Sequence, residues 1–350
     1  MDTMGNGVTV VILNWNGKKW LSTFLPSVVK TTYQPCKILL VDNGSSDDSV
    51  AFVKENYPSI HLLELKENYG FAEGNNRALP VIDTPYFALL NSDVEVSPGW
   101  LEPLVETMDK RPELASVQPK ILAWNQKDHF EYAGASGGFI DSWGYPFCRG
   151  RLFDTLEKDE GQYNQSLDVF WATGACCLVR KSVVDKIGLF DPDFFAHMEE
   201  IDFCWRAQNH GYRIACEPQS EVFHVGGGTL PQGNPRKTFL NARNNLWMLY
   251  KNLPQKVLGR RIAIRMMLDG VWGIKSLLSG EPTTTWAIIR GHMAFWKSIS
   301  QMKQKRKAVL PENLAAVPQS GYFDKSIVWH YFIRRAKIFS DLNLASDSEE

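Results

Sequence analysis

Four short apolar runs alternate with amphipathic stretches over the first part of the chain. The runs at 8–15, 37–42, 60–65 and 86–93 are rich in β-branched and aliphatic residues, so each predicts a buried strand. The stretches between them, at 18–30, 48–57 and 71–82, predict helices, with Pro26 interrupting the first and Ser46 or Asp47 capping the second. Strands separated by helices of this length indicate a parallel α/β sheet.

The pattern after residue 98 predicts a second half of less regular character. The expected elements are a helix at 99–110, a Gly- and aromatic-rich loop or hairpin insert at 131–151, a strand and a helix within 168–188, a helix at 199–211, and a strand from 220 that ends in a glycine cluster. From about residue 235 the chain is helical and basic, so we place a domain boundary near residue 240.

The composition is that of a globular protein. With 350 residues and 44% hydrophobic content, the chain is long enough for one large domain or for a catalytic domain with an accessory one. Six cysteines without a CxxC pair predict buried free thiols in a reducing compartment. The N-terminal segment MDTMGNG lacks the basic and apolar regions of a signal peptide, and no uncharged apolar run reaches 18 residues. We therefore expect a cytoplasmic protein without a spanning helix.

The charge is spread unevenly along the chain. The formal net charge of −1 gives no global field for nucleic acid, but residues 251–310 carry a net +10 and the remainder carries −11. The predicted helices at 259–280 and 283–307, and a third at 323–339, mix aliphatic residues and Trp with Lys and Arg. This composition is typical of helices that lie in an anionic lipid interface, at the inner face of the cytoplasmic membrane. The alternative is a helical hairpin whose basic face packs on the acidic half.

Polar clusters follow three of the predicted strands, at Asn14-Trp15-Asn16, Asp42-Asn43-Gly44 and Asn91-Ser92-Asp93. In a parallel sheet, ligands bind beyond these carboxyl ends. The first strand is not followed by G-x-G-x-x-G, and no G-x-x-x-x-G-K-[ST] occurs, which argues against a dinucleotide dehydrogenase and a P-loop protein. The segment ENYGFAEGNN places Gly70, Gly74, Asn75 and Asn76 at a strand-to-helix turn, where backbone N–H groups suit a diphosphate. Ordinary turn chemistry is the alternative.

Seven segments, taken in order, resemble the motifs of family 2 glycosyltransferases. They are VVILNWNG, LLVDNGSSDDS, ENYGFAEGNN, LLNSDVEV, TGACCLVRKSVVDKIGLFDPDFF, MEEIDFCWR and HVGGGT, and they cover roughly residues 8–245. The most similar branch is the rhamnosyltransferase-like enzymes that build bacterial surface polysaccharides. The resemblance implies a GT-A fold with a mixed central sheet, a nucleotide-binding half at 1–95, an acceptor-binding half at 96–240 and a helical region at 241–350.

The resemblance implies a set of donor-binding residues. Asp42 accepts a hydrogen bond from the pyrimidine ring N–H, which selects uracil or thymine and therefore a UDP- or dTDP-sugar; an Asx-turn is the alternative role. Asn14, Trp15 and Asn16 border the base, and Asn91 bonds a ribose hydroxyl. The remaining implied donor contacts are Gly70, Asn76, Ser92, Gly174 and Ala175, with Arg243 approaching the diphosphate.

The resemblance also implies a divalent cation, Mn²⁺ or Mg²⁺, at Asp93. Family members commonly have Asp-x-Asp where this chain has Asn91-Ser92-Asp93, so the site has lost one negative charge. Metal binding should therefore depend on diphosphate oxygens as further ligands and should be weak without nucleotide. His224 is the best second ligand and would favour Mn²⁺, although a strand-end histidine bonded to backbone is the alternative.

In the family an acidic pair near a helix start holds the base that deprotonates the acceptor hydroxyl. The usual pair is Glu-Asp, and alignment with Glu199-Glu200 puts Glu200 in the base position. Glu199 and Asp202 are rivals, because clustered carboxylates raise one another's pKa. The alternative is acids favoured by a helix N-terminus.

These roles imply an inverting glycosyltransferase. It would move a sugar, such as rhamnose, from a nucleoside-diphosphate donor to a hydroxyl of a glycan or lipid-linked acceptor in polysaccharide biosynthesis. A sugar-phosphate nucleotidyltransferase is the rival enzyme, but NWNGKKW lacks its Gly-rich basic loop. A non-catalytic sugar-nucleotide or glycan-binding module is the rival without chemistry.

Overall fold

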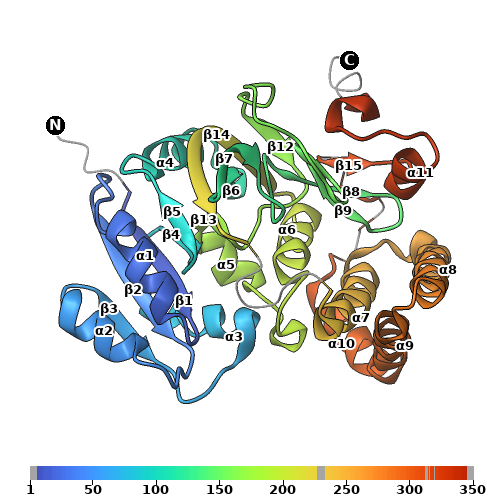
Figure 1. Ribbon diagram of the computed structural model, residues 1–350, viewed down its shortest axis with the longest axis horizontal. Helices are drawn as coiled ribbons and strands as arrows, with labels where there is room; N and C mark the ends of the chain where they lie inside the picture. Colours follow the sequence, from blue (N-terminus) through green and yellow to red (C-terminus); the bar gives the residue numbers. More distant parts are fainter. Residues whose placement is uncertain (1–5, 227–232, 312–313, 315, 319, 345–350) are drawn as a thin grey trace.

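The computed structural model describes residues 6–226, 233–311, 314, 316–318 and 320–344. A large mixed sheet runs through the molecule in the order β12-β14-β6-β13-β4-β1-β2-β3, with β5 beside β14 and β7 beside β6 (Figure 1). Its strands are β1 (Val8–Asn14), β2 (Cys36–Asp42), β3 (His61–Glu64), β4 (Tyr86–Asn91), β5 (Val94–Val96), β6 (Leu114–Ala123), β7 (Gln126–Phe130), β12 (Leu167–Val169), β13 (Cys176–Arg180) and β14 (Arg213–His224).

A smaller sheet in the order β11-β10-β9-β8-β15 is built from the Gly-rich insert and a strand near the C-terminus. Its strands are β8 (Gly138–Asp141), β9 (Pro146–Cys148), β10 (Arg151–Leu152), β11 (Thr155–Leu156) and β15 (Tyr322–Phe323). The insert predicted at 131–151 is therefore a set of short hairpins, to which β15 adds in parallel with β8.

The helices of the first 210 residues are α1 (Lys18–Val28), α2 (Ser49–Asn56), α3 (Gly70–Asn76), α4 (Leu101–Lys110), α5 (Lys181–Ile187) and α6 (Glu199–Asn209), with 3₁₀ turns η1 (Leu79–Val81) and η2 (Pro192–Phe194). The C-terminal region holds α7 (Pro235–Asn252), α8 (Gln255–Leu278), α9 (Pro282–Lys297), α10 (Ile299–Val309), α11 (Ile327–Phe332) and η3 (Phe339–Leu342). Four of these helices, α7 to α10, group at one end of the molecule (Figure 1).

The four predicted parallel strands are confirmed in position and direction. β1 pairs in parallel with both β2 and β4, and β2 pairs in parallel with β3. Alternate residues of β1 enter two apolar clusters, with Val11 on one face and Val10 and Ile12 on the other. A strand whose two faces are both covered reads as a continuous apolar run, which is why the sequence predicts it well. β13 is antiparallel to β4, so the sheet as a whole is mixed.

Tertiary contacts change several predicted helices. α1 continues through Pro26, because this proline lies in the last turn and its missing N–H would face the carbonyl of exposed Ser22. The helix predicted at 71–82 ends at Asn76, and η1 follows around Pro80. The helix predicted at 283–307 breaks at Ser298, whose hydroxyl accepts a hydrogen bond from Trp247 Nε1. Of the helix predicted at 323–339, only 327–332 is helical.

α7 crosses the domain boundary expected near residue 240. Its residues Leu246, Met248 and Leu249 are buried in the same apolar cluster as residues of the main sheet. None of the described helices combines the length and the apolar character that crossing a bilayer requires. The six cysteines are all free, and five are buried. Gly227, Gly228 and Thr229 of the predicted glycine cluster lie outside the described residues.

Candidate functional site

The polar ends of β1, β2 and β4 meet at one edge of the sheet. The strand register sets Asn14 opposite Asp42, and Leu13 opposite Asn91. A Cβ added to Gly17, just after β1, would lie 3.6 Å from Ser92 Oγ, so the loops that follow β1 and β4 are also in contact. The three polar clusters of the sequence therefore form one surface.

Asp42 is buried at this edge, and both of its carboxylate oxygens accept hydrogen bonds. Asn14 Nδ2 lies 3.0 Å from Oδ1, and the backbone N–H of Ser45 lies 2.9 Å from Oδ2. The second contact is the Asx-type turn that the sequence left open. Each carboxylate oxygen has a second lone pair, so the turn does not exhaust its capacity to accept. Trp15, next to Asn14, is 46% exposed and available to a planar ring.

Asn16 has a different role from the one that the resemblance implies. It adopts a positive φ of 50°, and its Oδ1 accepts from the backbone N–H groups of Ser46 and Asp47 at 2.7 and 3.3 Å. The side chain thus shapes the loop after β2. Asp47 in turn accepts from the backbone N–H of Lys18 and of Ser49, which ties the starts of α1 and α2 together.

Asp93 and His224 lie side by side. His224 ends β14, which pairs with β5 so that His224 is opposite Val94, and its Nε2 is 3.2 Å from Asp93 Oδ1. On the other side of the ring, Nδ1 is 3.2 Å from Oε2 of Glu131, a residue that the sequence analysis did not single out. Burial acts to lower the pKa of His224, but the two carboxylates outweigh it and raise that pKa to about 10. The sequence placed Glu131 in an irregular insert, which gave no strand-end signal.

The chemistry of this donor set fits one divalent cation held by two protein side chains. A carboxylate oxygen and an imidazole nitrogen 3.2 Å apart match neighbouring ligands of a six-coordinate ion, and Glu131 stands where a carboxylate commonly orients a ligating imidazole. Among the described residues, no group of three or more His, Cys, Asp or Glu side chains converges on a metal position. The remaining ligands would have to come from a bound diphosphate and water.

The chain at Gly174-Ala175 brings the base candidate to the same edge. Ala175 accepts a hydrogen bond from the backbone N–H of Asn91 at 2.9 Å. A Cβ added to Gly174 would lie 3.9 Å from Glu200 Cβ and 3.0 Å from the Phe71 ring. Glu200 is therefore a close neighbour of the strand ends, and any larger residue at position 174 would crowd the space between them.

Glu199 and Glu200 begin α6 with little to compensate their charge. An Oε2 atom of each is buried without a hydrogen-bond partner. Burial raises the pKa of Glu200 to about 7, and burial together with the neighbouring Glu200 raises the pKa of Glu199 well above its usual value. A carboxyl group with a pKa near neutrality is suited to act as a base.

Backbone strain is concentrated just before α6. Phe195, His197 and Met198 have φ angles of 65°, 72° and 73°, a backbone region that residues other than Gly and Asn rarely adopt. Asn244, fully buried on α7, holds this segment by donating to the carbonyls of Phe194, Ala196 and His197 at 2.9, 2.9 and 2.8 Å. The sequence showed Asn244 only as one of several polar residues in a helix.

Arg243 also supports this segment, which differs from the implied approach to the diphosphate. Its guanidinium donates to the carbonyls of Asp193 and Phe194 and lies 4.0 Å from the Trp247 ring centroid. Burial lowers the pKa of Arg243 to about 10.

Asp202 is corrected as a candidate base. It is completely buried, and it forms ion pairs with Arg206 at 2.9 Å and Lys251 at 2.8 Å, while Asn252 donates to its second oxygen. Both oxygens of Asp202 thus have partners within the protein, whereas Glu200 has an Oε2 atom without one.

The implied contacts at α3 are also corrected. The N–H groups of Phe71 and Ala72 at the start of the helix donate to the carbonyl of Phe195, so they are not free for a diphosphate. Gly70 has a φ of 79°, and an added Cβ would lie 2.6 Å from the Phe195 side chain, which explains the glycine. Asn76 bonds both the N–H and the carbonyl of Phe190 and therefore anchors the chain before α6.

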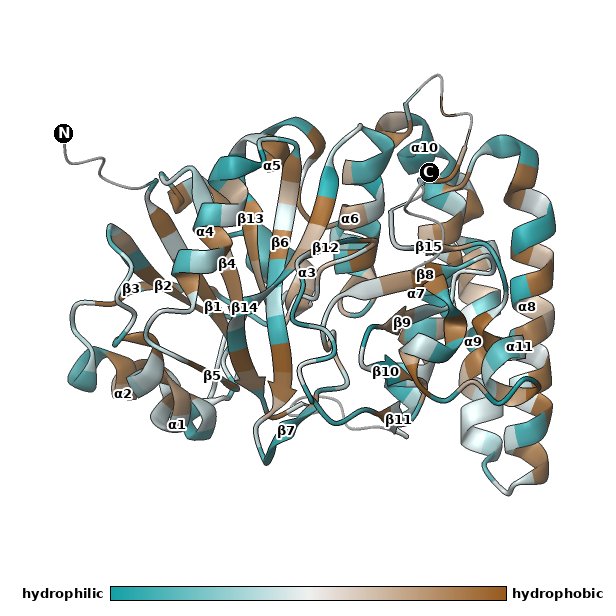
Figure 2. Cartoon of the chain, turned by 90° about the horizontal axis from the view of Figure 1, so that it is seen from above, coloured by the Kyte–Doolittle hydropathy of each residue, from teal (hydrophilic) through white to brown (hydrophobic). Residues whose placement is uncertain are grey.

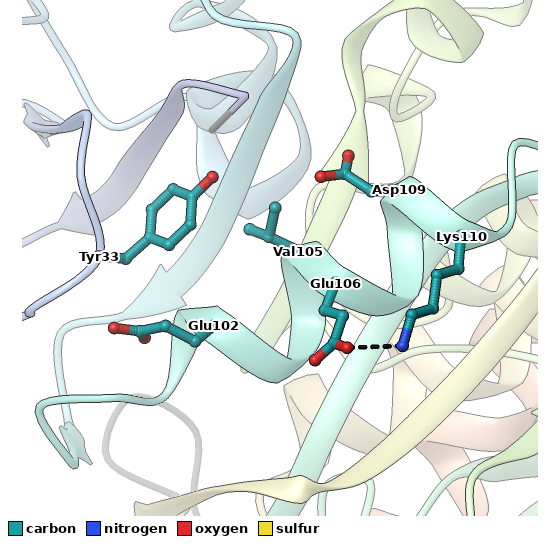
Figure 3. Close-up of a pocket in the computed structure, with 6 residues that line it drawn as sticks. All are labelled: Tyr33, Glu102, Val105, Glu106, Asp109 and Lys110. Carbon is teal, nitrogen blue, oxygen red and sulfur yellow. Dashed lines mark hydrogen bonds and ion pairs between the residues drawn. The ribbon is translucent and has the colours of Figure 1, made fainter. Parts of the chain in front are cut away.

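A surface pocket on α4 lies away from this edge (Figure 3). It is lined by Tyr33, Glu102, Val105, Glu106, Asp109 and Lys110. The Tyr33 hydroxyl donates to the carbonyl of Asn6, which precedes β1, so the pocket is at the opposite, amino-terminal edge of the parallel strands. Glu106 and Lys110, one turn apart on α4, form an ion pair in this lining.

Comparison with known proteins agrees with this geometry. A family model described as "Glycosyl transferase family 2" matches residues 9–188. An N-acetylglucosaminyl-diphospho-decaprenol L-rhamnosyltransferase of Mycobacterium tuberculosis is 28% identical over 240 residues, which are 63% of this chain and 76% of that protein. The low-salt glycan biosynthesis hexosyltransferase Agl10 of Haloferax volcanii is 23% identical, over 61% of this chain and 65% of that protein.

Solved structures share the fold. GalNAc-T7, solved with UDP, GalNAc and Mn²⁺, aligns with a TM-score of 0.59 at 15% identity over 86% of this chain and 58% of that one. TarS 1–349 of S. aureus aligns with a TM-score of 0.53 at 13% identity, over 87% and 83%. The mixed sheet and these alignments show a GT-A fold. The chain belongs to glycosyl transferase family 2, as the resemblance implied.

Proposed function

We propose that this protein is an inverting glycosyltransferase that transfers a hexose, with rhamnose as the leading candidate, from a nucleoside-diphosphate sugar to an acceptor hydroxyl. The observation that carries the proposal is the position of Glu200, a half-buried residue with one buried, unpartnered carboxyl oxygen and a pKa raised to about 7. It lies beside Gly174, at the same sheet edge as Asp42 and the Asp93–His224 pair. Family membership makes sugar transfer the expected chemistry for this arrangement.

Glu200 is proposed as the general base. Its carboxylate would take the proton of the acceptor hydroxyl while the oxygen attacks the anomeric carbon, and the nucleoside diphosphate departs from the opposite face. One displacement on one face inverts the anomeric configuration. Glu199 stays the rival for this role. It is a buried neighbour of Glu200, and two adjacent carboxyl groups favour a state in which the pair holds a proton.

The donor is proposed to be a dTDP- or UDP-sugar. Asp42 retains lone pairs for a pyrimidine ring N–H, which uracil and thymine carry and cytosine lacks. Asp93 and His224 would hold a divalent cation, preferably Mn²⁺, and such an ion neutralises charge that develops on a diphosphate leaving group. GalNAc-T7, which has a similar fold and was solved with Mn²⁺, supports a divalent cation of this kind.

The acceptor is proposed to be a glycan or a lipid-linked saccharide in polysaccharide synthesis, since the name of the M. tuberculosis relative specifies a decaprenol-linked one. We place the reaction at the cytoplasmic face of the membrane. A non-catalytic binding module is disfavoured by the unpartnered, buried Oε2 atoms of Glu199 and Glu200, which cost stability without contributing to donor binding.

Nucleotide-dependent thermal stabilisation tests the donor assignment. With Mn²⁺ present, UDP or dTDP should raise the melting temperature more than GDP or CDP, and Asp42→Asn should weaken this preference. If no nucleoside diphosphate stabilises the protein, or if all four do so equally, the proposed base-binding role of Asp42 is wrong.

A further inference from the structure

The outer face of the helices α8 and α9 carries apolar side chains where a solvated helix would carry polar ones. On α8, residues spaced by three or four positions are 61% to 84% exposed, and on α9 the same spacing gives residues that are 43% to 58% exposed. We call this set the outer face: Met267, Val271, Ile274 and Leu278 on α8, and Trp286, Ile289, Met293 and Trp296 on α9.

The inner side of the same helices holds a buried polar network beside buried apolar residues. Arg265 and Asp269 of α8 are buried and paired at 2.9 Å, and His292 of α9 lies 3.2 Å from Asp269. Tyr145, from the smaller sheet, donates to Asp269, and Arg265 donates to Asn245 of α7. The hairpin is thus fixed to the molecule by this polar network together with buried apolar residues such as Ile262 and Phe295, and it still carries further apolar residues on its outer side.

The apolar surface continues onto α11. Trp329, Phe332 and Ile333 are 52% to 60% exposed, and the Lys275 amine of α8 lies 5.7 Å from the Phe332 ring centroid. Both views place α8, α9 and α11 at the end of the molecule away from α2 and β3, and Figure 2 shows hydrophobic colour along the outside of α8 (Figures 1 and 2).

Basic side chains accompany these apolar residues. Five exposed cations of α8 and α9 form no ion pair with any residue that the structure describes: Lys256, Arg260, Lys275, Arg290 and Lys297. Residues 251–310 carry a net +10. A surface of aliphatic and Trp side chains among unpaired cations matches the boundary between the headgroups and acyl chains of an anionic bilayer.

We propose that the outer face docks the protein on the surface of an anionic membrane, with α8 and α9 lying in the interface. A second copy of the chain is a poorer partner, because two such faces would bring like charges together. The surface extends the proposed function, since an acceptor carried on a lipid would be presented in the same plane. It does not depend on that function, because docking needs neither donor nor acceptor.

Vesicle co-sedimentation of the full-length protein tests the proposal. The protein should bind vesicles of equimolar phosphatidylglycerol and phosphatidylcholine, bind pure phosphatidylcholine much more weakly, and lose affinity for the anionic vesicles as salt rises. The triple variant Met267→Ser/Ile274→Ser/Leu278→Ser should bind the anionic vesicles about tenfold or more weakly, because it removes the side chains that would enter the lipid.

A matched triple variant controls for the loss of exposed apolar surface. Val29→Ser/Val81→Ser/Leu167→Ser changes residues that are 39% to 55% exposed elsewhere on the molecule, and its vesicle binding should equal that of the wild type. Equal melting temperatures of both variants would show that folding is intact. Absence of vesicle binding by the wild type overturns the proposal, as does unchanged binding by the outer-face variant. A dimer that this variant dissociates, without vesicle binding, would identify the face as a protein interface instead.

Discussion

At the scale of single residues, the buried Glu199 and the half-buried Glu200 are the most perturbed carboxyl groups near the site. Glu199 and Glu200 lie at the start of α6, where each has an Oε2 atom without a hydrogen-bond partner. Burial raises both pKa values, which means that the folded state binds these protons more tightly than the unfolded chain does. Stability from this source is fully present below the unfolded pKa and declines as the pH rises towards about 7.

Glu199→Gln tests this electrostatic cost. The variant removes one charge that the fold does not compensate, so its melting temperature should exceed that of the wild type at mildly alkaline pH, and the difference should shrink at mildly acidic pH. Glu55→Gln, at an exposed position on α2, is the matched control and should change neither value. A wild type whose stability does not fall between mildly acidic and mildly alkaline pH would contradict the account.

The Asp93–His224 pair makes a second prediction at this scale. Because two side chains among the described residues are proposed as ligands, the free protein should bind Mn²⁺ weakly, and UDP or dTDP should strengthen that binding. Asp93→Asn should weaken nucleotide-dependent Mn²⁺ binding about tenfold or more, whereas Glu95→Gln in the next strand should leave it unchanged. Calorimetry with metal alone, nucleotide alone and both together measures these differences. Tight binding of Mn²⁺ to the free wild type would refute the two-ligand site.

At the scale of elements, one helix of the C-terminal region fixes the segment that precedes α6 and the proposed base. Asn244 of α7 donates to the carbonyls of Phe194, Ala196 and His197, within a segment where Phe195, His197 and Met198 have positive φ angles. A segment in this conformation persists only where its surroundings determine it. α7 therefore supports the segment that leads into α6, although the sequence pattern assigned most of it to a separate region.

Asn244→Ala should relax this segment and let water reach Glu200. The expected result is a lower kcat, a pH–rate midpoint shifted below about 7, and a loss of stability of about 2–4 kcal/mol from unsatisfied carbonyls. Asn245→Ala is the matched control, since Asn245 is equally buried on the same helix but donates to Gly144. It should lower stability without moving the midpoint. Equal midpoints in both variants and the wild type would show that Asn244 has only a structural role.

The sequence could predict those parts of the fold and of the candidate site that depend on interactions between residues close together in the chain. The strands that hold Asp42 and Asp93 are specified by local apolar runs, and their polar ends meet because parallel strands share an edge. The contacts at the site that the sequence did not predict join residues far apart along the chain. Phe195 occupies the N–H groups of α3, and Glu131 stands behind His224. No periodicity in either segment signals such a contact.

At the scale of the whole molecule, a buried ion cluster joins the two parts of the chain. Lys251 of α7 lies 2.8 Å from both Asp191 and Asp202, and Lys305 of α10 also contacts Asp191. Burial acts to raise the pKa of Asp191, but Lys251 lowers it to about 2. Some basic residues of the C-terminal region thus pair with acidic residues of the first region, as one of the two sequence interpretations expected. The five exposed cations of α8 and α9 described above do not take part in this cluster.

Lys251→Met should be strongly destabilising, because it leaves two buried carboxylates with less compensation. We expect a loss of about 3–5 kcal/mol at neutral pH, measured by denaturant unfolding, and a smaller loss for Lys305→Met, whose side chain is partly exposed. The contribution of Asp191 should persist above its unfolded pKa and be lost as the pH falls towards about 2. Equal losses in the two variants, or a stable 1–240 fragment, would argue for two independent domains.

The most direct test of the central claim is sugar transfer by the wild type and by Glu200→Gln, measured with a saturating dTDP- or UDP-sugar, Mn²⁺ and a lipid-linked acceptor. The wild type should give a product of inverted anomeric configuration, with kcat/KM rising with pH to a plateau above about 7 as Glu200 loses its proton. Glu200→Gln should be slower by about 10²–10⁴ while its stabilisation by the nucleotide is unchanged. A product of retained configuration, or undiminished transfer by Glu200→Gln, would contradict the account.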